Sequence, residues 1–272
     1  YYVQDSSSMF VGDIFRRLLK EYELPAGRPL RVLDLCAAPG GKTTDLAASL
    51  REACGDGFVL VANEVMKQRA GILASNVALW GDPNVVVTSD DPKAFTPFTG
   101  YFDIILADVP CSGEGMFRKD EQACEQWSED NVALCEGRQR RIIADVWPAL
   151  ADGGLLVYST CTFNKYENDG NVRWIADNLG GSPVFNAPAS PFGGVIATEY
   201  GFSLVPGFVK GEGQYCSAVR KQGGSIAVSE FRQYKTRPSK DKGTPIPASL
   251  KELFSIDVNF RQRGETIIAL PA

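Results

Sequence analysis

Two cysteines in this chain stand in sequence contexts that suit covalent chemistry. Cys111 lies in Asp-x-Pro-Cys, within ADVPCSGEG, and Cys161 lies in Thr-Cys-Thr, within STCTFN. Each follows a short apolar run that predicts a buried strand. Ligands of open α/β sheets bind beyond the carboxyl ends of the strands, so both cysteines are expected at a site. A free cysteine is more often a small buried apolar residue, and we interpret four others in that way: Cys54, Cys124, Cys135 and Cys216.

The chemistry open to such a pair is addition to a pyrimidine ring. A thiolate is a soft nucleophile, and the C6 carbon of cytosine is an electrophile that it can attack. Addition at C6 makes C5 electron-rich, so that C5 can take an activated methyl group. The charge that develops at N3 needs a proton or a hydrogen bond, and Asp108, three residues before Cys111, is placed to supply it. Loss of the C5 proton and expulsion of the thiol then release the product.

Activation of a thiol has to come without histidine, because the chain contains none. This excludes Ser-His-Asp and Cys-His catalysis and histidine-bound metal within the chain. Cys161 precedes a predicted helix start, where the helix dipole and free N–H groups lower a thiol pKa. Lys165 adds a nearby positive charge.

A small-residue turn, VLDLCAAPGGKT, follows the first predicted strand and ends in Gly-Lys-Thr like a phosphate-binding P-loop. A P-loop needs a glycine five residues before Gly41, and that residue is Cys36, which argues against ATP. A strand, a turn and a helix start also offer N–H groups to the carboxylate or nucleoside end of a small cofactor. An ordinary strand-to-helix turn fits this segment equally well. The candidate cofactor residues are Cys36, Ala37, Ala38, Pro39, Gly40, Gly41 and Lys42.

Carboxylates follow the second and third predicted strands. Glu64 is placed to accept hydrogen bonds from ribose hydroxyls, as acidic residues do in dinucleotide sites. Asp91, or alternatively Asp90, is placed to meet an adenine amino group. Any one of them alone would be read as a strand-end cap. Together they favour an adenosine ligand without phosphates, which points to S-adenosyl-L-methionine as the cofactor.

The elements that must position these residues alternate between strand and helix. We predict strands at 31–36, 58–63, 84–88, 102–107 and 155–159, and helices at 43–51, 66–80, 128–150 and 165–178, with an opening helix at 8–22. This alternation is typical of a mostly parallel sheet with helices on both faces. Two further runs, 203–205 and 214–220, predict a closing antiparallel hairpin.

Composition limits the class of protein. Seven cysteines, without a Cys-x-x-Cys pair, argue against a disulfide framework and a thiolate zinc site, so we expect no metal and a reducing cytoplasm. No run of about 18 apolar residues predicts a membrane span. The net charge of −5 does not indicate nucleic-acid binding by itself. Residues 206–272, however, carry eleven Lys/Arg against six Asp/Glu, which suits local contact with a polyanion or a solvated linker.

Three stretches, DLCAAPGGKT, DVPCSGEGMFRK and YSTCTFNKYEND, resemble the motifs of the RNA 5-methylcytosine methyltransferases. This family includes bacterial rRNA enzymes and eukaryotic NOL1/NOP2/Sun-type enzymes, and GEGMFRK is similar to the bacterial RsmF-like branch. The resemblance covers about residues 1–221. It implies an α/β fold, the Rossmann-like class I S-adenosylmethionine-dependent methyltransferase fold, with a mostly parallel seven-stranded sheet.

The resemblance also implies roles for particular residues. Residues 36–42 bind S-adenosyl-L-methionine, Glu64 holds the ribose and Asp91 approaches the adenine. Asp108 contacts both the cofactor and the target base. Cys161 is the nucleophile at C6, and Cys111 assists product release. DNA cytosine methyltransferases use the Pro-Cys cysteine instead, but their motif lacks the Thr-Cys-Thr partner, so the second cysteine favours RNA.

The implied substrate is a cytosine in RNA, most simply small-subunit ribosomal RNA, unpaired or flipped out of its stack. Five basic residues are candidate phosphate contacts, or equally a solvated face: Arg118, Lys119, Arg138, Arg140 and Arg141. We expect a monomer. Transfer RNA as the substrate, a catalytically silent RNA-binding module and a P-loop nucleotidase are the alternatives.

The expected organisation is a catalytic domain at 1–221, with a helical lead-in at 1–25. Residues 222–246 lack periodicity and are rich in glycine and proline, so they predict a linker. Residues 247–272 predict the start of a small C-terminal domain that opens with a hairpin. The chain begins inside a segment that looks structured and shows no secretory signal, so we expect further residues upstream.

Overall fold

The computed structural model describes residues 2–223, 258–263 and 266–271. The chain divides into two units, Tyr1–Ser229 and Glu230–Ala272. In the second unit the described residues form an antiparallel pair, β10 (Val258–Arg263) with β11 (Thr266–Pro271), where a hairpin is expected from the sequence. All but residues 222 and 223 of the expected linker, 222–246, lie outside the described residues.

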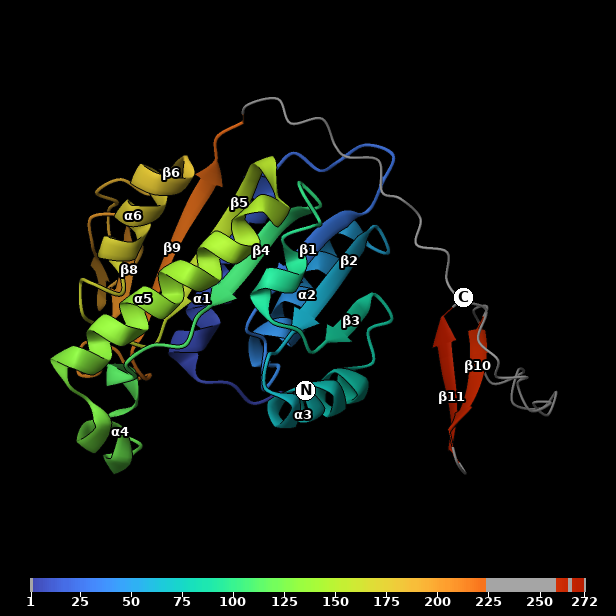
Figure 1. The fold of residues 1–272 in the computed structure, drawn as a ribbon, viewed down its shortest axis with the longest axis horizontal. Helices are drawn as coiled ribbons and strands as arrows, with labels where there is room; N and C mark the ends of the chain where they lie inside the picture. Colours follow the sequence, from blue (N-terminus) through green and yellow to red (C-terminus); the bar gives the residue numbers. More distant parts are fainter. Residues whose placement is uncertain (1, 224–257, 264–265, 272) are drawn as a thin grey trace. The chain divides into compact units, whose positions relative to one another are not determined.

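Five parallel strands form the core of the first unit (Figure 1). They are β1 (Leu30–Asp34), β2 (Phe58–Asn63), β3 (Val85–Thr88), β4 (Phe102–Asp108) and β5 (Leu150–Thr160), in the order β3-β2-β1-β4-β5. Six of the seven residues of β4 are buried, as expected for a central strand covered by helices on both faces. The predicted parallel α/β sheet is therefore confirmed.

The closing hairpin is also confirmed, and the sheet extends further than expected. β9 (Gln214–Lys221) runs antiparallel to β5 and to β8 (Gly201–Leu204). Two three-residue strands, β6 (Gly181–Pro183) and β7 (Val195–Ala197), join this edge and bring the sheet to nine strands within the described residues, rather than seven. Such short strands show no alternating pattern that a sequence reading could detect.

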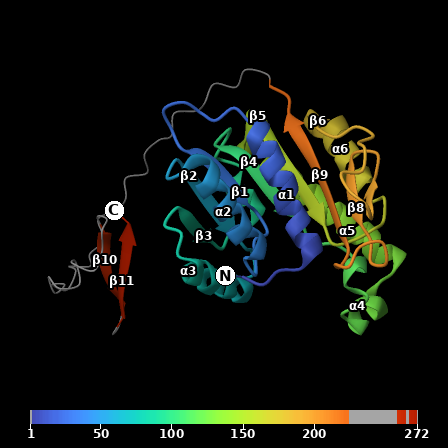
Figure 2. The ribbon, with the colours of Figure 1, turned by 180° about the vertical axis from the view of Figure 1, so that it is seen from behind.

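Helices cover both faces of the sheet. On one face lie α1 (Ser6–Glu21), α2 (Gly41–Cys54) and α3 (Lys67–Trp80), of which α1 and α2 are seen in front in Figure 2. On the other face lie α5 (Glu129–Val146) and α6 (Asp169–Leu179), in front in Figure 1. Each face has its own buried apolar cluster, one around Phe15 and Leu50 and the other around Ile143 and Ile175. The short helix α4 (Glu121–Gln126) precedes α5.

Two predicted helices differ from the structure at their ends. The helix expected at 128–150 stops at Val146, and the 3-10 turn η3 (Trp147–Ala149) then leads into β5. Pro148 has no N–H to continue an α-helix, and its ring clashes with the preceding turn. The helix expected at 165–178 begins later, at Asp169. The Asn168 side chain instead accepts from Thr160 Oγ1 (2.6 Å) and donates to the Thr162 carbonyl (3.0 Å), which competes with a helical turn.

Candidate active site

The carboxyl ends of β1, β4 and β5 bring together most of the residues singled out in the sequence. Asp108 is the last residue of β4, and the parallel register pairs it with Ser159 of β5. Cys111 therefore follows β4 and Cys161 follows β5 at the same edge of the sheet. Fifty residues apart in sequence, their Sγ atoms are 3.0 Å apart. Both thiols are free, because a disulfide would need about 2.05 Å.

The two thiols have opposite pKa shifts. The hydrogen bond from the Cys111 thiol lowers the pKa of Cys161, and the positive charge of Lys42 acts in the same direction, against burial and the charge of Asp108. The hydrogen bond to Cys161, together with burial, raises the pKa of Cys111 well above its ordinary value. The pair therefore loses its first proton from Cys161, and Cys111 keeps its proton as the donor.

Asp108 is held by three side chains from three different elements. Lys42 Nζ lies 2.8 Å from Oδ2, and Ser159 Oγ donates to Oδ1 over 2.6 Å. Gln214 Nε2, at the start of β9, donates to Oδ1 over 3.3 Å. The contacts fix the orientation of the carboxylate between the turn after β1 and the cysteine pair.

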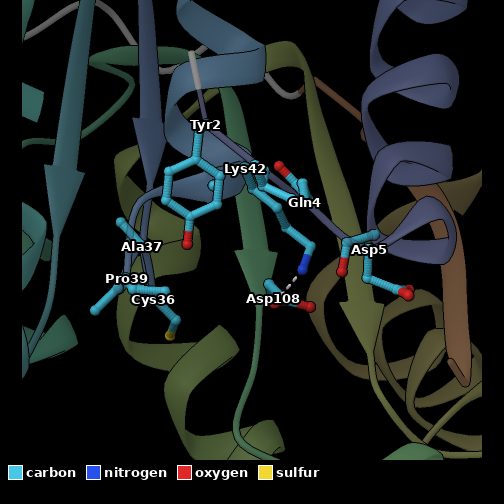
Figure 3. A pocket seen from close by; sticks show the side chains of 12 residues that line it. Tyr2, Gln4, Asp5, Cys36, Ala37, Pro39, Lys42 and Asp108 are labelled. Carbon is cyan, nitrogen blue, oxygen red and sulfur yellow. Dashed lines mark hydrogen bonds and ion pairs between the residues drawn. The ribbon is translucent and has the colours of Figure 1, made fainter. Parts of the chain in front are cut away.

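The turn after β1 lines a cavity of about 210 Å³ (Figure 3). Of the seven residues of this turn that are proposed for the cofactor, 36–42, all but Gly40 line the cavity, and Asp108 lines it as well. Gly40 adopts φ +114°, a conformation that favours glycine, and it turns the chain into α2. Five further residues near the start of the chain complete the lining, and no motif in the sequence indicates them: Tyr2, Val3, Gln4, Asp5 and Ser8 of α1.

The residues present fit a cofactor with a charged amino-acid end and a nucleoside. Gly41 and Lys42, at the start of α2, line the cavity, and the first N–H groups of a helix have no partner within the helix. Lys42 and Asp108 provide both signs of charge. A Cβ on Gly41 would lie 2.8 Å from the Tyr2 ring, so a larger residue there would have to displace the Tyr2 side chain from the wall of the cavity. Burial raises the pKa of Cys36, which argues for a neutral thiol in the wall of the cavity rather than a nucleophile.

Glu64 and Asp91 do not line this cavity. Glu64 is buried, and its carboxylate accepts from the Met66 N–H (2.9 Å) and lies 3.2 Å from Arg69, which also donates to the Ala38 carbonyl. Asp91 is exposed and caps the 3-10 turn η1 (Pro92–Phe95) by accepting from the Lys93 N–H. Their roles toward ribose and adenine stay predictions.

The candidate phosphate contacts are partly engaged within the protein. Arg118 lies 2.8 Å and Lys119 3.6 Å from the same carboxylate, that of Glu212. Arg140 pairs with Glu136 one turn earlier on α5. Arg141 lies 3.9 Å from Asp91. Contact with RNA at these positions would have to compete with the internal ion pairs.

Asp34, at the end of β1, is a buried carboxylate that the sequence reading did not single out. Thr43 Oγ1 donates to its Oδ2 over 2.6 Å, but its Oδ1 has no hydrogen-bond partner among the described residues. Burial raises the pKa of Asp34 from 3.8 to about 7, and the hydrogen bond from Thr43 only partly offsets this. The group is therefore protonated in the folded state at a pH where it ionises in the unfolded chain.

Asp34→Asn should change how stability depends on pH. Between pH 4 and 7 the folded state of the natural chain binds more protons at Asp34 than the unfolded state does, so this group lowers the free energy of unfolding as pH rises. The variant removes that slope, and its stability relative to the natural chain should rise by on the order of 4 kcal/mol between pH 4 and pH 8. Urea unfolding at both pH values measures this. Asp177→Asn, at an exposed carboxylate, is the control. An equal stability gap at both pH values would contradict the prediction.

The sequence reading also missed two buried carboxylates around the cysteine pair, Glu114 and Glu167. Glu114 lies within the GEG stretch and Glu167 within NKYEND, so the motifs contained them. Their type gave no signal, because an isolated Glu in a loop is ordinarily solvated.

Comparison with known proteins identifies the family. The sequence model of the family described as 16S rRNA methyltransferase RsmB/F matches residues 25–219. The chain belongs to this family. The matched residues include both cysteines, Asp108 and the turn after β1, so the resemblance to RsmF-like methyltransferases expected from the motifs is confirmed.

Curated relatives of this RsmB/F chain are named ribosomal RNA small subunit methyltransferase F. The protein of Pectobacterium atrosepticum is 36% identical over 227 residues, which are 82% of this chain and 45% of the relative. The protein of Shewanella denitrificans is 32% identical over 267 residues, which are 96% of this chain and 50% of the relative. The chain thus spans about half the length of the curated relatives it matches.

Solved structures place the RsmB/F chain in the expected fold. NSun6 from Pyrococcus horikoshii, determined with SFG, has a TM-score of 0.65 at 27% identity and covers 82% of this chain and 53% of its own. A methyltransferase homolog from the same organism has a TM-score of 0.63 at 26% identity, covering 81% and 68%. The predicted class I methyltransferase fold is confirmed, and so is S-adenosyl-L-methionine as the cofactor that goes with it.

In the part of the chain that the structure describes, no helix combines the length and apolar character needed to cross a bilayer. Over the same residues, no three His, Cys, Asp or Glu side chains are grouped so that they could hold a metal ion.

Proposed function

We propose that this chain methylates C5 of a cytosine in ribosomal RNA, with S-adenosyl-L-methionine as the methyl donor and a covalent bond between Cys161 and C6 as the intermediate. The observation that carries the proposal is the 3.0 Å contact between the two sulfurs, with the pKa of Cys161 lowered and that of Cys111 raised. The contact brings the proposed nucleophile and a hydrogen-bond donor for its sulfur together, at the edge of the sheet that also carries Asp108.

In the first step the Cys161 thiolate adds to C6. The π pair of the C5=C6 double bond forms a C4=C5 double bond, and the π pair of the C4=N3 double bond moves onto N3, which takes a proton. Lys42 is the source of this proton, and Asp108, 2.8 Å away, passes it on to N3. Asp108 is held by Ser159 and Gln214, so it can act without reorienting.

In the second step N3 returns its proton and C5 forms a bond to the methyl group. The cofactor supplies this methyl on a positively charged sulfonium, which leaves as a neutral thioether. The chain's own contribution is position, because six residues of the turn after β1 line one cavity together with Asp108. The methyl donor and the target cytosine would therefore meet at one edge of the sheet.

In the last step C5 loses its proton to water, the C5–C6 double bond re-forms and the Cys161 thiolate leaves. The Cys111 thiol, which keeps its own proton, donates a hydrogen bond to the leaving sulfur and so makes it a better leaving group. This is the role in product release that the family resemblance implies.

Within this proposal residues 1–221 form the catalytic domain, Glu64 contacts the ribose and Asp91 the adenine.

The proposal predicts transfer of tritiated methyl groups from S-adenosyl-L-methionine to ribosomal RNA. Purified protein should label small-subunit rRNA, and bisulfite sequencing should find the label as 5-methylcytosine. Separate pools of transfer RNA and rRNA serve as matched substrates. Labelling of transfer RNA alone would show that transfer RNA, the alternative substrate, is methylated by the same chemistry. RNA binding without consumption of the cofactor would instead indicate a silent binding module and contradict the proposal.

A further inference from the structure

The two cysteines sit on loops beyond the ends of the strands, where the sheet no longer holds them. The Cys111 loop, residues 110–117, follows β4, and the Cys161 loop, residues 161–168, follows β5. The parallel ladder between these strands ends at the pair Asp108 and Ser159. β5 stays paired with β9 as far as Thr160, but among the described residues no ladder joins the two loops, so contacts between the loops help to set the distance between the sulfurs.

Glu114, on the Cys111 loop, binds the Cys161 loop. Its Oε2 accepts hydrogen bonds from Thr162 Oγ1 (2.6 Å), Phe163 N–H (2.6 Å) and Asn164 N–H (2.9 Å). Its Oε1 accepts from Trp127 Nε1 over 2.9 Å. Burial raises the pKa of Glu114, but these hydrogen bonds outweigh burial and the pKa falls below its ordinary value. The carboxylate is therefore charged, and each of its bonds is charge-assisted.

Glu167, on the Cys161 loop, binds the Cys111 loop in return. It is fully buried and accepts from the Ser112 N–H over 3.1 Å, next to Cys111. Gln139 of α5 donates to it over 2.6 Å and also to the Pro110 carbonyl over 2.9 Å. Each loop thus carries one carboxylate that accepts backbone N–H groups of the other loop.

Further contacts also join the two loops. The Asn164 side chain donates to Glu167 Oε1 over 2.7 Å, while its backbone N–H donates to Glu114, so it joins both carboxylates. The Gly115 N–H donates to the Cys161 carbonyl over 2.8 Å, and a Cβ on Gly115 would lie 2.7 Å from that oxygen. The loops are therefore in backbone contact, and only glycine permits it at this point.

We propose that Glu114 and Glu167 are positioning residues, which hold the two loops together so that the Cys111 thiol stays hydrogen-bonded to the Cys161 sulfur. This extends the proposed function, because it assigns the geometry of that same cysteine pair to two carboxylates that do not touch the base. The contacts are reciprocal, because each carboxylate lies on one loop and accepts hydrogen bonds from the other. Breaking either carboxylate leaves N–H donors of the opposite loop without that acceptor, which loosens the contact between the loops.

Glu114→Gln tests the proposal, since it keeps the shape but turns one acceptor oxygen into a donor facing other donors. The readout is the pH dependence of iodoacetamide alkylation at Cys161, followed by peptide mass spectrometry, which needs neither RNA nor cofactor. Without the Cys111 hydrogen bond the midpoint should move to higher pH, as it should in Cys111→Ala, and alkylation at neutral pH should fall on the order of tenfold. Methyl transfer should fall by about 10²-fold, the effect of a small misplacement of reacting atoms.

Two further variants complete the experiment. Asn164→Ala removes, at a half-buried position, the side chain that donates to Glu167. It should shift the midpoint of Cys161 alkylation to higher pH, and it keeps the test open if Glu114→Gln does not fold. Glu125→Gln, at an exposed carboxylate on α4, should match the natural chain. An unchanged Cys161 midpoint in the folded variants would overturn the proposal, whatever happens to methyl transfer. A shifted midpoint in a protein whose natural form transfers no methyl group would uphold the positioning role and refute the proposed function.

Discussion

Cys161→Ala is expected to lose methyl transfer to RNA while still binding S-adenosyl-L-methionine. The variant has no atom that can add to C6, so C5 never becomes electron-rich and the methyl group has no acceptor. Loss of a covalent nucleophile lowers the rate by on the order of 10⁴-fold or more. Cofactor binding should persist because Cys161 does not line the cavity beside the turn after β1.

Tritiated methyl incorporation measures the first effect, and isothermal titration with the cofactor measures the second. Cys124→Ala is the matched control, because Cys124 is an exposed thiol outside the pair and its loss should leave the rate unchanged. Full activity of Cys161→Ala would refute the nucleophile assignment. Loss of both activity and cofactor binding would point to a cofactor role for this residue instead.

Cys111→Ala is expected to accumulate a covalent complex between the protein and RNA. Addition of Cys161 to C6 and methyl transfer need no atom of Cys111, although the first addition should slow as the pKa of Cys161 rises toward its ordinary value. Expulsion of the Cys161 sulfur, however, loses the hydrogen bond that stabilises the leaving thiolate. The slowest step therefore moves to product release, and the methylated adduct persists.

A band of retarded mobility on denaturing gels, which nuclease treatment removes, is the measurement for this adduct. The double variant Cys111→Ala with Cys161→Ala is the control and should show no such band, because the bond to RNA is made by Cys161. Normal turnover of Cys111→Ala without a retarded band would remove the release role. A band that survives in the double variant would show that another group bonds to the RNA.

Much of the fold followed from local patterns in the chain. Apolar strands such as 58–63 and 102–107 are short, bounded and separated by helical periodicity, and the structure reproduces them nearly residue for residue. The ends of 128–150 and 165–178 were wrong because Pro148 and the side chain of Asn168 impose turns that periodicity does not register. β6 and β7 were missed because three residues are too few to show an alternating pattern.

Residue type and position in the chain determined which side chains stand at the ends of strands, among them Cys111, Cys161 and Asp108. They also determined that the first turn lacks the glycine that a P-loop needs five residues before Gly41. Only the tertiary structure decided that the sulfurs touch and which of them loses its proton first, because both depend on the register of β4 beside β5 and on Lys42 from a third element. The same holds for Glu114 and Glu167: a carboxylate becomes a fixed acceptor only when folding buries it against N–H groups about 50 residues away in the sequence.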